Sequence, residues 1–197
     1  MKPSSTLDTR GGSALVWLRF AAVGVIGAGL LYPAVATFTG QALFPAQARG
    51  SMIERDGVQV GSSLVAQPFV GAGYFRPRPS AAGYDPRAVS GSNLGPGNPV
   101  LRERIATTSA EVAAREGLAA ADIPTDLVTA SGSGIDPHIS PGAAAVQVAR
   151  VARARGLEPA AVQALVARHT QGPSLGVFGQ SRVNVLELNL ALDAAAP

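Results

Sequence analysis

The most constraining feature of this sequence is a long uncharged stretch near its N-terminus. No charged side chain occurs between Phe20 and Ala48. The first part, Phe20 to Phe38, reads FAAVGVIGAGLLYPAVATF, and at about 1.5 Å per helical residue it reaches roughly the 30 Å thickness of a bilayer's hydrocarbon core. Because lipid offers no hydrogen-bond partners to the backbone, a lone segment of this kind can cross only as a helix. The sequence therefore predicts a membrane protein with one transmembrane helix, over residues 14–38.

Five residues of the predicted helix are expected to act in the membrane anchor. Gly24 and Ala28 would let a neighbouring helix approach closely, although glycines are also simply tolerated in apolar runs. Pro33 leaves one backbone carbonyl without its helical partner and is expected to bend the helix. Tyr32 is an amphipathic ring of the type that favours membrane interfaces, and Arg19 can extend its charge to the membrane surface.

The charges beside the apolar stretch predict its orientation. Lys2, Arg10 and Arg19 precede it against a single acid, Asp8, whereas basic and acidic residues alternate after it. The cytoplasmic flank of a membrane helix carries the excess of basic residues. We therefore expect a single-pass protein of the cell (inner) membrane, with a cytoplasmic tail over residues 1–13, a linker over residues 39–52 and an extracytoplasmic domain over residues 53–197.

A cleaved signal peptide is the alternative to a permanent anchor. Ala46-Gln47-Ala48 resembles the small-residue pattern that precedes a cleavage site, and a chain beginning at Arg49 would lack the helix. The apolar region is longer than the ~7–15 residues usual for a signal peptide, which favours the anchor.

The composition after Pro45 excludes several functional classes. Thirteen arginines nearly balance twelve acidic residues in this region, so nucleic-acid binding lacks a concentrated basic face. The chain has no cysteine, which excludes disulfides, thiolate metal sites and a cysteine nucleophile. Its one lysine is Lys2, which excludes a phosphate-binding P-loop. His138 and His169 lie in separate segments, so we expect no metal site.

The first part of the outer domain is predicted to contain a hairpin followed by a long ordered loop. Alternating apolar residues follow Asp56-Gly57, a pair typical of two-residue hairpin turns, and predict a hairpin over residues 53–67. Residues 67–99 are crowded with Gly and Pro, which excludes a helix or a central strand, yet they retain aromatic residues that can anchor the segment. Long ordered loops are usually functional.

The rest of the domain is predicted to alternate helices with strands. Asn98 and Ser140 can each cap a helix and are each followed by proline, while Gly117 and Gly156 are typical of helix ends. Alternating leucines and β-prone residues predict strands. Such a mixture indicates an α/β or α+β domain. The expected helices cover 99–116, 141–155 and a segment from Pro159 that carries His169, and the expected strands cover 127–130 and 182–192.

One polar cluster raises a catalytic alternative. Ser133 lies between two glycines, with Asp136 and His138 shortly after it. The segment lacks a complete GxSxG motif, and spacing alone cannot show the geometry of a triad. A turn that leads into a capped helix is the simpler interpretation, and the alternative is an anchored or secreted hydrolase that uses these three residues.

Six strings of residues, taken in order, resemble one known family. They resemble the C subunit of the bacterial high-affinity potassium-transporting P-type ATPase, the Kdp complex. Gly179-Gln180-Ser181 departs from this family, whose members commonly have Gly-Glu-Pro there. The strings are GSSLVAQPF (61–69), YFRPRPSAAGYD (74–85), SGSNLGPGNP (90–99), IPTDLVTASGSGIDPHISPGAA (123–144), QVARVARARGL (147–157) and RVNVLELNLALD (182–193).

The resemblance implies a non-catalytic accessory subunit of an ATP-driven potassium uptake complex. Its implied partners are a potassium-selective pore subunit, a separate ATP-hydrolysing subunit and membrane lipid. The family's C subunit is described as a catalytic chaperone that supports assembly and raises the pump's affinity for ATP, and the position implicated in that role matches Gln147. The subunit alone is expected to bind no cofactor. It would act on ATP and K⁺ only as part of the complex.

An ATP contact at Gln147 conflicts with the predicted orientation, because ATP is scarce outside the cell. The charge asymmetry has a direct physical cause, so we favour a domain that acts from outside by docking on the potassium-selective subunit. An ordered loop with aromatic anchors presents a rigid surface at small entropic cost. The predicted partner contacts in this loop are Tyr74, Phe75, Arg76, Tyr84, Asn93 and Asn98.

Overall fold

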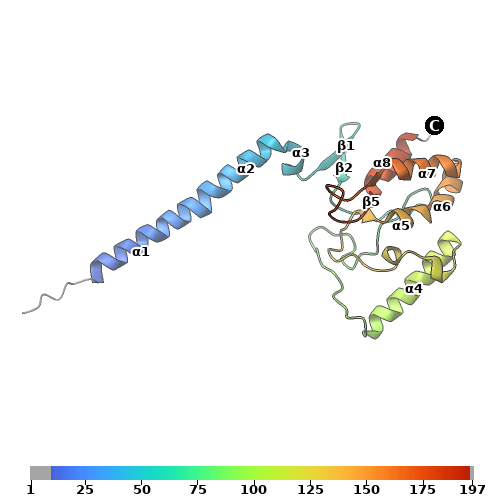
Figure 1. The fold of residues 1–197 in the computed structure, drawn as a ribbon, viewed down its shortest axis with the longest axis horizontal. Helices are drawn as coiled ribbons and strands as arrows, with labels where there is room; N and C mark the ends of the chain where they lie inside the picture. Colours follow the sequence, from blue (N-terminus) through green and yellow to red (C-terminus); the bar gives the residue numbers. More distant parts are fainter. Residues whose placement is uncertain (1–9, 196–197) are drawn as a thin grey trace, which may run out of the picture. The chain divides into compact units, whose positions relative to one another are not determined.

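The computed structural model describes residues 10–195, with side chains from Ala14 onward, and divides into two compact units at Met52/Ile53. The flanking charges Lys2 and Asp8, which entered the prediction of orientation, lie outside the described residues. In the first unit, α1 (Arg10–Gly24), the π-helical segment η1 (Val25–Leu31) and α2 (Tyr32–Leu43) form one continuous helix (Figure 1). A short helix, α3 (Pro45–Ala48), follows.

This N-terminal helix has the length and composition of a membrane span. Its apolar part covers the 30 residues Ala14–Leu43, within which an 18-residue stretch has a mean hydropathy of 2.0, and none of its described side chains is buried in the protein. The apolar helix expected from the sequence is thus confirmed, and it runs beyond the predicted end at Phe38. Exposed apolar side chains such as Phe20 (73%) and Leu30 (64%) are stable where lipid or another chain covers them.

The π-helical segment accommodates Pro33. Proline has no N–H, so the carbonyl four residues before it loses its usual partner. The preceding residue, Tyr32, donates its N–H to Gly27 O, five residues back, which is the hydrogen bond of a π-turn. The other predicted anchor residues, Arg19, Gly24 and Ala28, are exposed, and a Cβ added to Gly24 would meet no atom within 4 Å. The small-residue face is thus uncovered in the described chain, and its role in packing stays a prediction.

The second unit begins with the predicted hairpin. Strands β1 (Met52–Arg55) and β2 (Val58–Ser62) pair with each other, and Asp56 and Gly57 form the turn between them. Both turn residues have positive φ, 53° and 77°, as a type I′ turn requires. The predicted hairpin is therefore confirmed at its turn, but it ends at Ser62 and does not extend to residue 67.

A long loop and a capped helix follow, as predicted. Residues 63–98, all of which the structure describes, form no helix or strand. Helix α4 (Pro99–Glu116) then starts where the side chain of Asn98 accepts a hydrogen bond from Val100 N at 2.9 Å. It ends at Gly117, which adopts the left-handed conformation typical of a helix end.

The helix predicted over residues 141–155 keeps both of its ends but is interrupted in the middle. Ser140 caps α5 (Pro141–Ala145), and left-handed Gly156 ends α6 (Val148–Arg155). The sequence predicts a single helix here, whereas the structure has a turn at residues 146–147 between α5 and α6. Helix α7 (Pro159–Arg168) is followed by His169 as its C-terminal cap rather than as a helical residue.

The two predicted strands of this region are largely wrong. Instead of a strand at 127–130, the chain forms a 3₁₀ turn, η3 (Thr125–Leu127), after a similar turn, η2 (Ala120–Asp122). Both the N–H and the hydroxyl of Thr129 donate to Thr125 O, at 2.9 and 2.8 Å, and these local bonds hold the turn. In the other segment only β5 (Arg182–Asn184) is a strand, and α8 (Val185–Ala195) takes the rest.

A small antiparallel sheet and four helices surround the core of the second unit. The strand order is β3 (His138–Ile139), β5, β4 (Thr170–Gln171), with Val183 of β5 opposite both Ile139 and Thr170. Helices α6, α7 and α8 pack one against the next, and α5 contacts α7 and β5 (Figure 1). The domain is therefore α+β, within the predicted fold class. The most deeply buried apolar residues, all at 0%, are Phe75, Ala143, Ala144, Val151, Val183, Leu188 and Leu192.

Replacing a leucine of α8 tests whether this helix belongs to the hydrophobic core. Leu188→Ala should lower the free energy of unfolding by about 2–5 kcal/mol, because the side chain is fully buried and the change leaves a cavity. The matched control Leu64→Ala, at a residue that is 58% exposed, should stay within about 0.5 kcal/mol. Denaturant titration of the full chain in detergent measures both, and equal effects would contradict the assignment.

Candidate functional site

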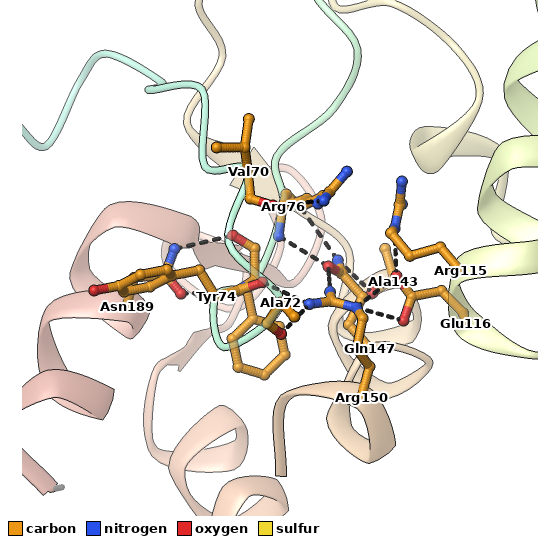
Figure 2. A network of polar contacts seen from close by, with 11 residues as sticks. Val70, Ala72, Tyr74, Arg76, Arg115, Glu116, Ala143, Gln147, Arg150 and Asn189 are labelled. Atoms are coloured by element: carbon orange, nitrogen blue, oxygen red, sulfur yellow. Dashed lines mark hydrogen bonds and ion pairs between the residues drawn. The ribbon is translucent and has the colours of Figure 1, made fainter. Parts of the chain in front are cut away.

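Gln147 occupies the turn between α5 and α6 and is fully buried. Its Oε1 accepts hydrogen bonds from the backbone N–H of Arg76 and from Arg150 Nη2, both at 2.8 Å. Its Nε2 donates to Arg76 O at 3.2 Å and to Ala143 O at 3.1 Å. Figure 2 shows the amide at the centre of these contacts. A glutamine amide offers two donors and two acceptor positions, so this side chain has its full hydrogen-bonding capacity in use.

A second buried amide repeats this arrangement one residue earlier in the loop. Asn189 of α8 is 1% exposed, and its Oδ1 accepts from Phe75 N at 2.8 Å while its Nδ2 donates to Phe75 O at 2.9 Å. Each amide thus binds both the N–H and the C=O of one loop residue, as a neighbouring β-strand would. We call Gln147 and Asn189, together with the loop residues that they bind, the amide clamp.

Two arginines of α6 bind the loop carbonyls beside the amide clamp. Arg150 donates through Nη1 to Ala72 O at 2.6 Å and to Tyr74 O at 2.9 Å. Arg155 donates through Nε to Gly73 O at 2.6 Å, and its guanidinium carbon lies 4.7 Å from the centre of the Tyr74 ring. Residues 72–76 are therefore held along their whole length by side chains from other elements.

Two carboxylates form ion pairs with the arginines of this region. Glu116, the last residue of α4, has a side chain that is 0% exposed and accepts from Arg150 Nε at 3.0 Å and from Arg115 Nε at 2.7 Å (Figure 2). Asp193 of α8 accepts from Arg155 Nη2 at 2.7 Å. Multiple charge-assisted donors offset the cost of removing these carboxylates from water.

Arg76 carries its charge in an unfavourable environment. Burial lowers the pKa of its guanidinium, and the positive charges of Arg115 and Arg150 lower this pKa further. Its Nε is buried without a hydrogen-bond partner among the described residues, although Nη2 donates to Val70 O at 2.7 Å. Arg76 and Arg115 also line a cavity of about 260 Å³ between the loop and α4, together with Tyr84, Thr108 and Glu111.

The structure places the six predicted partner contacts in different environments. Phe75 is fully buried, so its side chain anchors the loop and offers no outer surface. Tyr74 and Tyr84 are half-buried and donate their hydroxyls to Asp193 Oδ2 at 3.3 Å and to Arg78 O at 2.9 Å. Asn93 is exposed. Asn98 uses its side chain as the cap of α4, and Arg76 belongs to the charged cluster, so partner contact through the accessible members stays a prediction.

The hydrolase alternative finds no support in the geometry. Asp136 Oδ1 lies 3.4 Å from His138 Nδ1, but the Ser133 hydroxyl accepts a hydrogen bond from Ile135 N at 3.2 Å, and no hydrogen bond joins Ser133 to His138 among the described residues. A neighbouring cavity of about 550 Å³ is lined by Asp136 and His138 but not by Ser133. The cluster thus forms a turn that leads into the cap of α5.

The environment of Asp136 favours its charged form. Burial alone would raise the pKa of the carboxyl, but hydrogen bonds from the side chain and backbone of His138, together with the charges of His138 and Arg78, hold this pKa below its usual value. Arg78 Nη1 lies 3.4 Å from the carboxylate. A carboxylate kept ionised in this way orders the loop around it. Within the described part of the chain, no three acidic or histidine side chains gather as metal ligands.

Sequence reasoning missed most of this site. Gln147 entered the prediction only through the family resemblance, and Asn189 lies within the strand predicted over residues 182–192. One signal was available: Asn189 falls on the same helical face as Val185, Leu188 and Leu192, at a spacing of three or four residues. A polar residue on such an apolar face needs a buried hydrogen-bond partner.

The fold and the site define a protein with one candidate membrane-spanning helix and an α+β domain whose long loop is fixed by buried amides. Residues 14–194 match the family model described as KdpC, K⁺-transporting ATPase, c chain. The chain therefore belongs to the KdpC family, as the resemblance in sequence predicted. The family name places it as one subunit of a potassium-transporting ATPase complex at the membrane.

Curated relatives match over nearly the whole chain. The chain is 55% identical over 193 residues to the potassium-transporting ATPase KdpC subunit of Shewanella putrefaciens, which covers 98% of this chain and 97% of that protein. The KdpC subunit of Xanthomonas campestris pv. campestris is 55% identical and covers 87% of this chain and 82% of its own. That of Kineococcus radiotolerans is 53% identical, with 89% and 90% covered.

Removing the Gln147 amide tests the clamp. Gln147→Ala should lower the free energy of unfolding by at least about 2 kcal/mol, because it leaves the N–H and C=O of Arg76 buried without partners. The control Gln163→Ala, at an exposed residue of α7, should change it by less than about 0.5 kcal/mol. Denaturant titration in detergent measures both. Equal stability of the two variants would mean that the amide is dispensable.

Proposed function

We propose that this chain is a non-catalytic accessory subunit of an ATP-driven potassium uptake complex. In this role it supports assembly and raises the affinity of the separate ATP-hydrolysing subunit for ATP by docking, without contacting the nucleotide itself. The observation that carries the proposal is the amide clamp, which uses Gln147 to fix a long loop. Membership of the KdpC family supports the assignment to a potassium-transporting ATPase.

A direct contact between Gln147 and ATP would require the clamp to open. The side chain is fully buried, and its four hydrogen bonds would have to be exchanged for contacts with the nucleotide. Each buried group left unpaired costs about 1–3 kcal/mol. An indirect route needs no such exchange, because a docked subunit that favours the ATP-binding state of its partner raises ATP affinity by linkage.

The cavity beside the clamp is a suitable place for the partner to dock. It is lined by Arg76 and Tyr84, two of the predicted contact residues, and by Arg115 of α4. Arg115 and Arg150 bind the carboxylate of Glu116, and Glu111 also lines the cavity, so three arginines with Arg76 outnumber two carboxylates and an excess of positive charge remains. Guanidinium groups bind carboxylates with two parallel hydrogen bonds, so an acidic side chain of the pore subunit is the complementary group.

The domain is proposed to act outside the cell. The basic residues Lys2, Arg10 and Arg19 favour a cytoplasmic N-terminus, so the region after the single helix would be extracytoplasmic. From there it can contact the potassium-selective subunit where ions enter. ATP and K⁺ are then handled by the partner subunits.

Filling the cavity tests the docking role. Thr108→Trp places a large ring at the cavity wall, and it should reduce co-purification with the pore subunit and raise the ATP concentration needed for half-maximal transport ATPase activity. Thr107→Trp, on the exposed side of the same helix, should leave both unchanged. Normal assembly and ATP dependence in both variants would contradict docking at this cavity.

Adding ATP to the purified chain tests the alternative of direct nucleotide binding. The purified full chain in detergent should show no stabilisation by millimolar ATP, whereas a direct site would add about 2.7 kcal/mol at a hundredfold excess over its dissociation constant. Stabilisation of that size, removed by Gln147→Asn, would favour direct nucleotide binding over docking.

The orientation is tested with a tag fused after Pro197. Protease added to intact spheroplasts should remove the tag, because the proposed topology places the C-terminus outside. A tag after Met1 should be cut only after lysis. The reverse pattern would place the domain in the cytoplasm and overturn the proposed route of action.

A further inference from the structure

A tight apolar turn projects from the domain between β4 and β5. The N–H of Ser174 donates to Phe178 O at 2.8 Å, and the N–H of Phe178 donates to Ser174 O at 2.9 Å, which closes a turn of three residues. Leu175 and Gly176 in this turn both have positive φ, 54° and 75°. We call residues 174–178 the apolar tip.

The side chains of the apolar tip lie almost entirely in solvent. Leu175 is 90% exposed, Val177 is 78% exposed and Phe178 is 67% exposed. The whole connection from residue 172 to residue 181 contains no charged side chain, and Arg168 and Arg182 stand on either side of it. Three large apolar side chains on one turn are costly in water, at about 25 cal/mol for each Å² exposed. Something apolar is therefore expected to cover them.

Chain connectivity keeps the domain near a bilayer. The membrane-length helix ends at Leu43, and the domain begins ten residues later at Ile53. Even a fully extended linker of this length spans at most about 35 Å. The tethered domain therefore meets the membrane surface at a high effective concentration, so a small apolar contact is enough to bind it.

The strand that follows the apolar tip is hydrogen-bonded to the residue that follows the first hairpin. The tip leads directly into β5, and Asn184 at the end of this strand donates from Nδ2 to Ser63 O at 2.7 Å. Ser63 follows β2, the strand through which the chain enters the domain from the linker. The contact joins the segment after the tip to the segment nearest the anchor in sequence.

We propose that the apolar tip inserts into the interface of the lipid bilayer that holds the anchor helix. Leu, Val and Phe on a narrow turn can reach the boundary between headgroups and acyl chains, while Arg168 and Arg182 remain among the phosphates. The tip offers a protein partner few polar side chains for a specific rim, whereas a bilayer requires only apolar area. This second membrane contact is independent of the docking role proposed above.

Tryptophan quenching tests the insertion. In a Trp17→Phe background, which removes the chain's one natural tryptophan, Phe178→Trp is reconstituted as the full chain in phosphatidylcholine nanodiscs. Its emission should shift to shorter wavelength and be lost when the lipids carry bromine near the top of their acyl chains. Val100→Trp, at an exposed residue at the start of α4, is the matched control and should show neither change.

Two further outcomes decide the proposal. Adding Leu175→Asp and Val177→Asp to the Phe178→Trp chain should abolish the quenching, because charged side chains keep the turn in water. Emission at long wavelength and without quenching in the unmodified tip would overturn the proposal. Shielding of the tryptophan only in the presence of the other ATPase subunits would also overturn it, since the tip would then be a protein contact.

Discussion

The fold of the second unit, residues 53–197, depends on side chains that satisfy the backbone of one extended segment. Residues 72–76 have no neighbouring strand, so those of their N–H and C=O groups that are removed from water, above all at the fully buried Phe75, would be left unpaired at about 1–3 kcal/mol each. The two carboxamides of the clamp and the arginines of α6 provide the missing partners. Because these side chains come from α5–α6 and α8, the same hydrogen bonds also fix the helices around the loop.

The features that could be predicted from the sequence are those decided by neighbouring residues. Asp56-Gly57 forms its turn because both residues tolerate positive φ, and Asn98 and Ser140 cap helices through contacts two or three residues away. The apolar N-terminal helix follows in the same way from a local run of side chains. Such signals need no knowledge of the tertiary fold.

The features that could not be predicted depend on distant partners. Leucines alternate in the last segment as in a strand, but Leu, Glu and Ala are strong helix formers, and burial of every third or fourth residue selects the helix. Gln147 interrupts its helix to reach Arg76, which is 71 residues away, and Asn189 reaches Phe75 across 114 residues. No local pattern encodes a pairing of that separation.

The π-helical turn before Pro33 changes the angular phase of the membrane helix. One residue more than an α-turn rotates everything beyond it by about 100°, since 3.6 residues complete a turn. The stripe that carries Gly24 and Ala28 therefore does not continue in line along α2. The two halves of this helix therefore present different sides to their surroundings, so one membrane-spanning helix can pack against two separate neighbours in the bilayer.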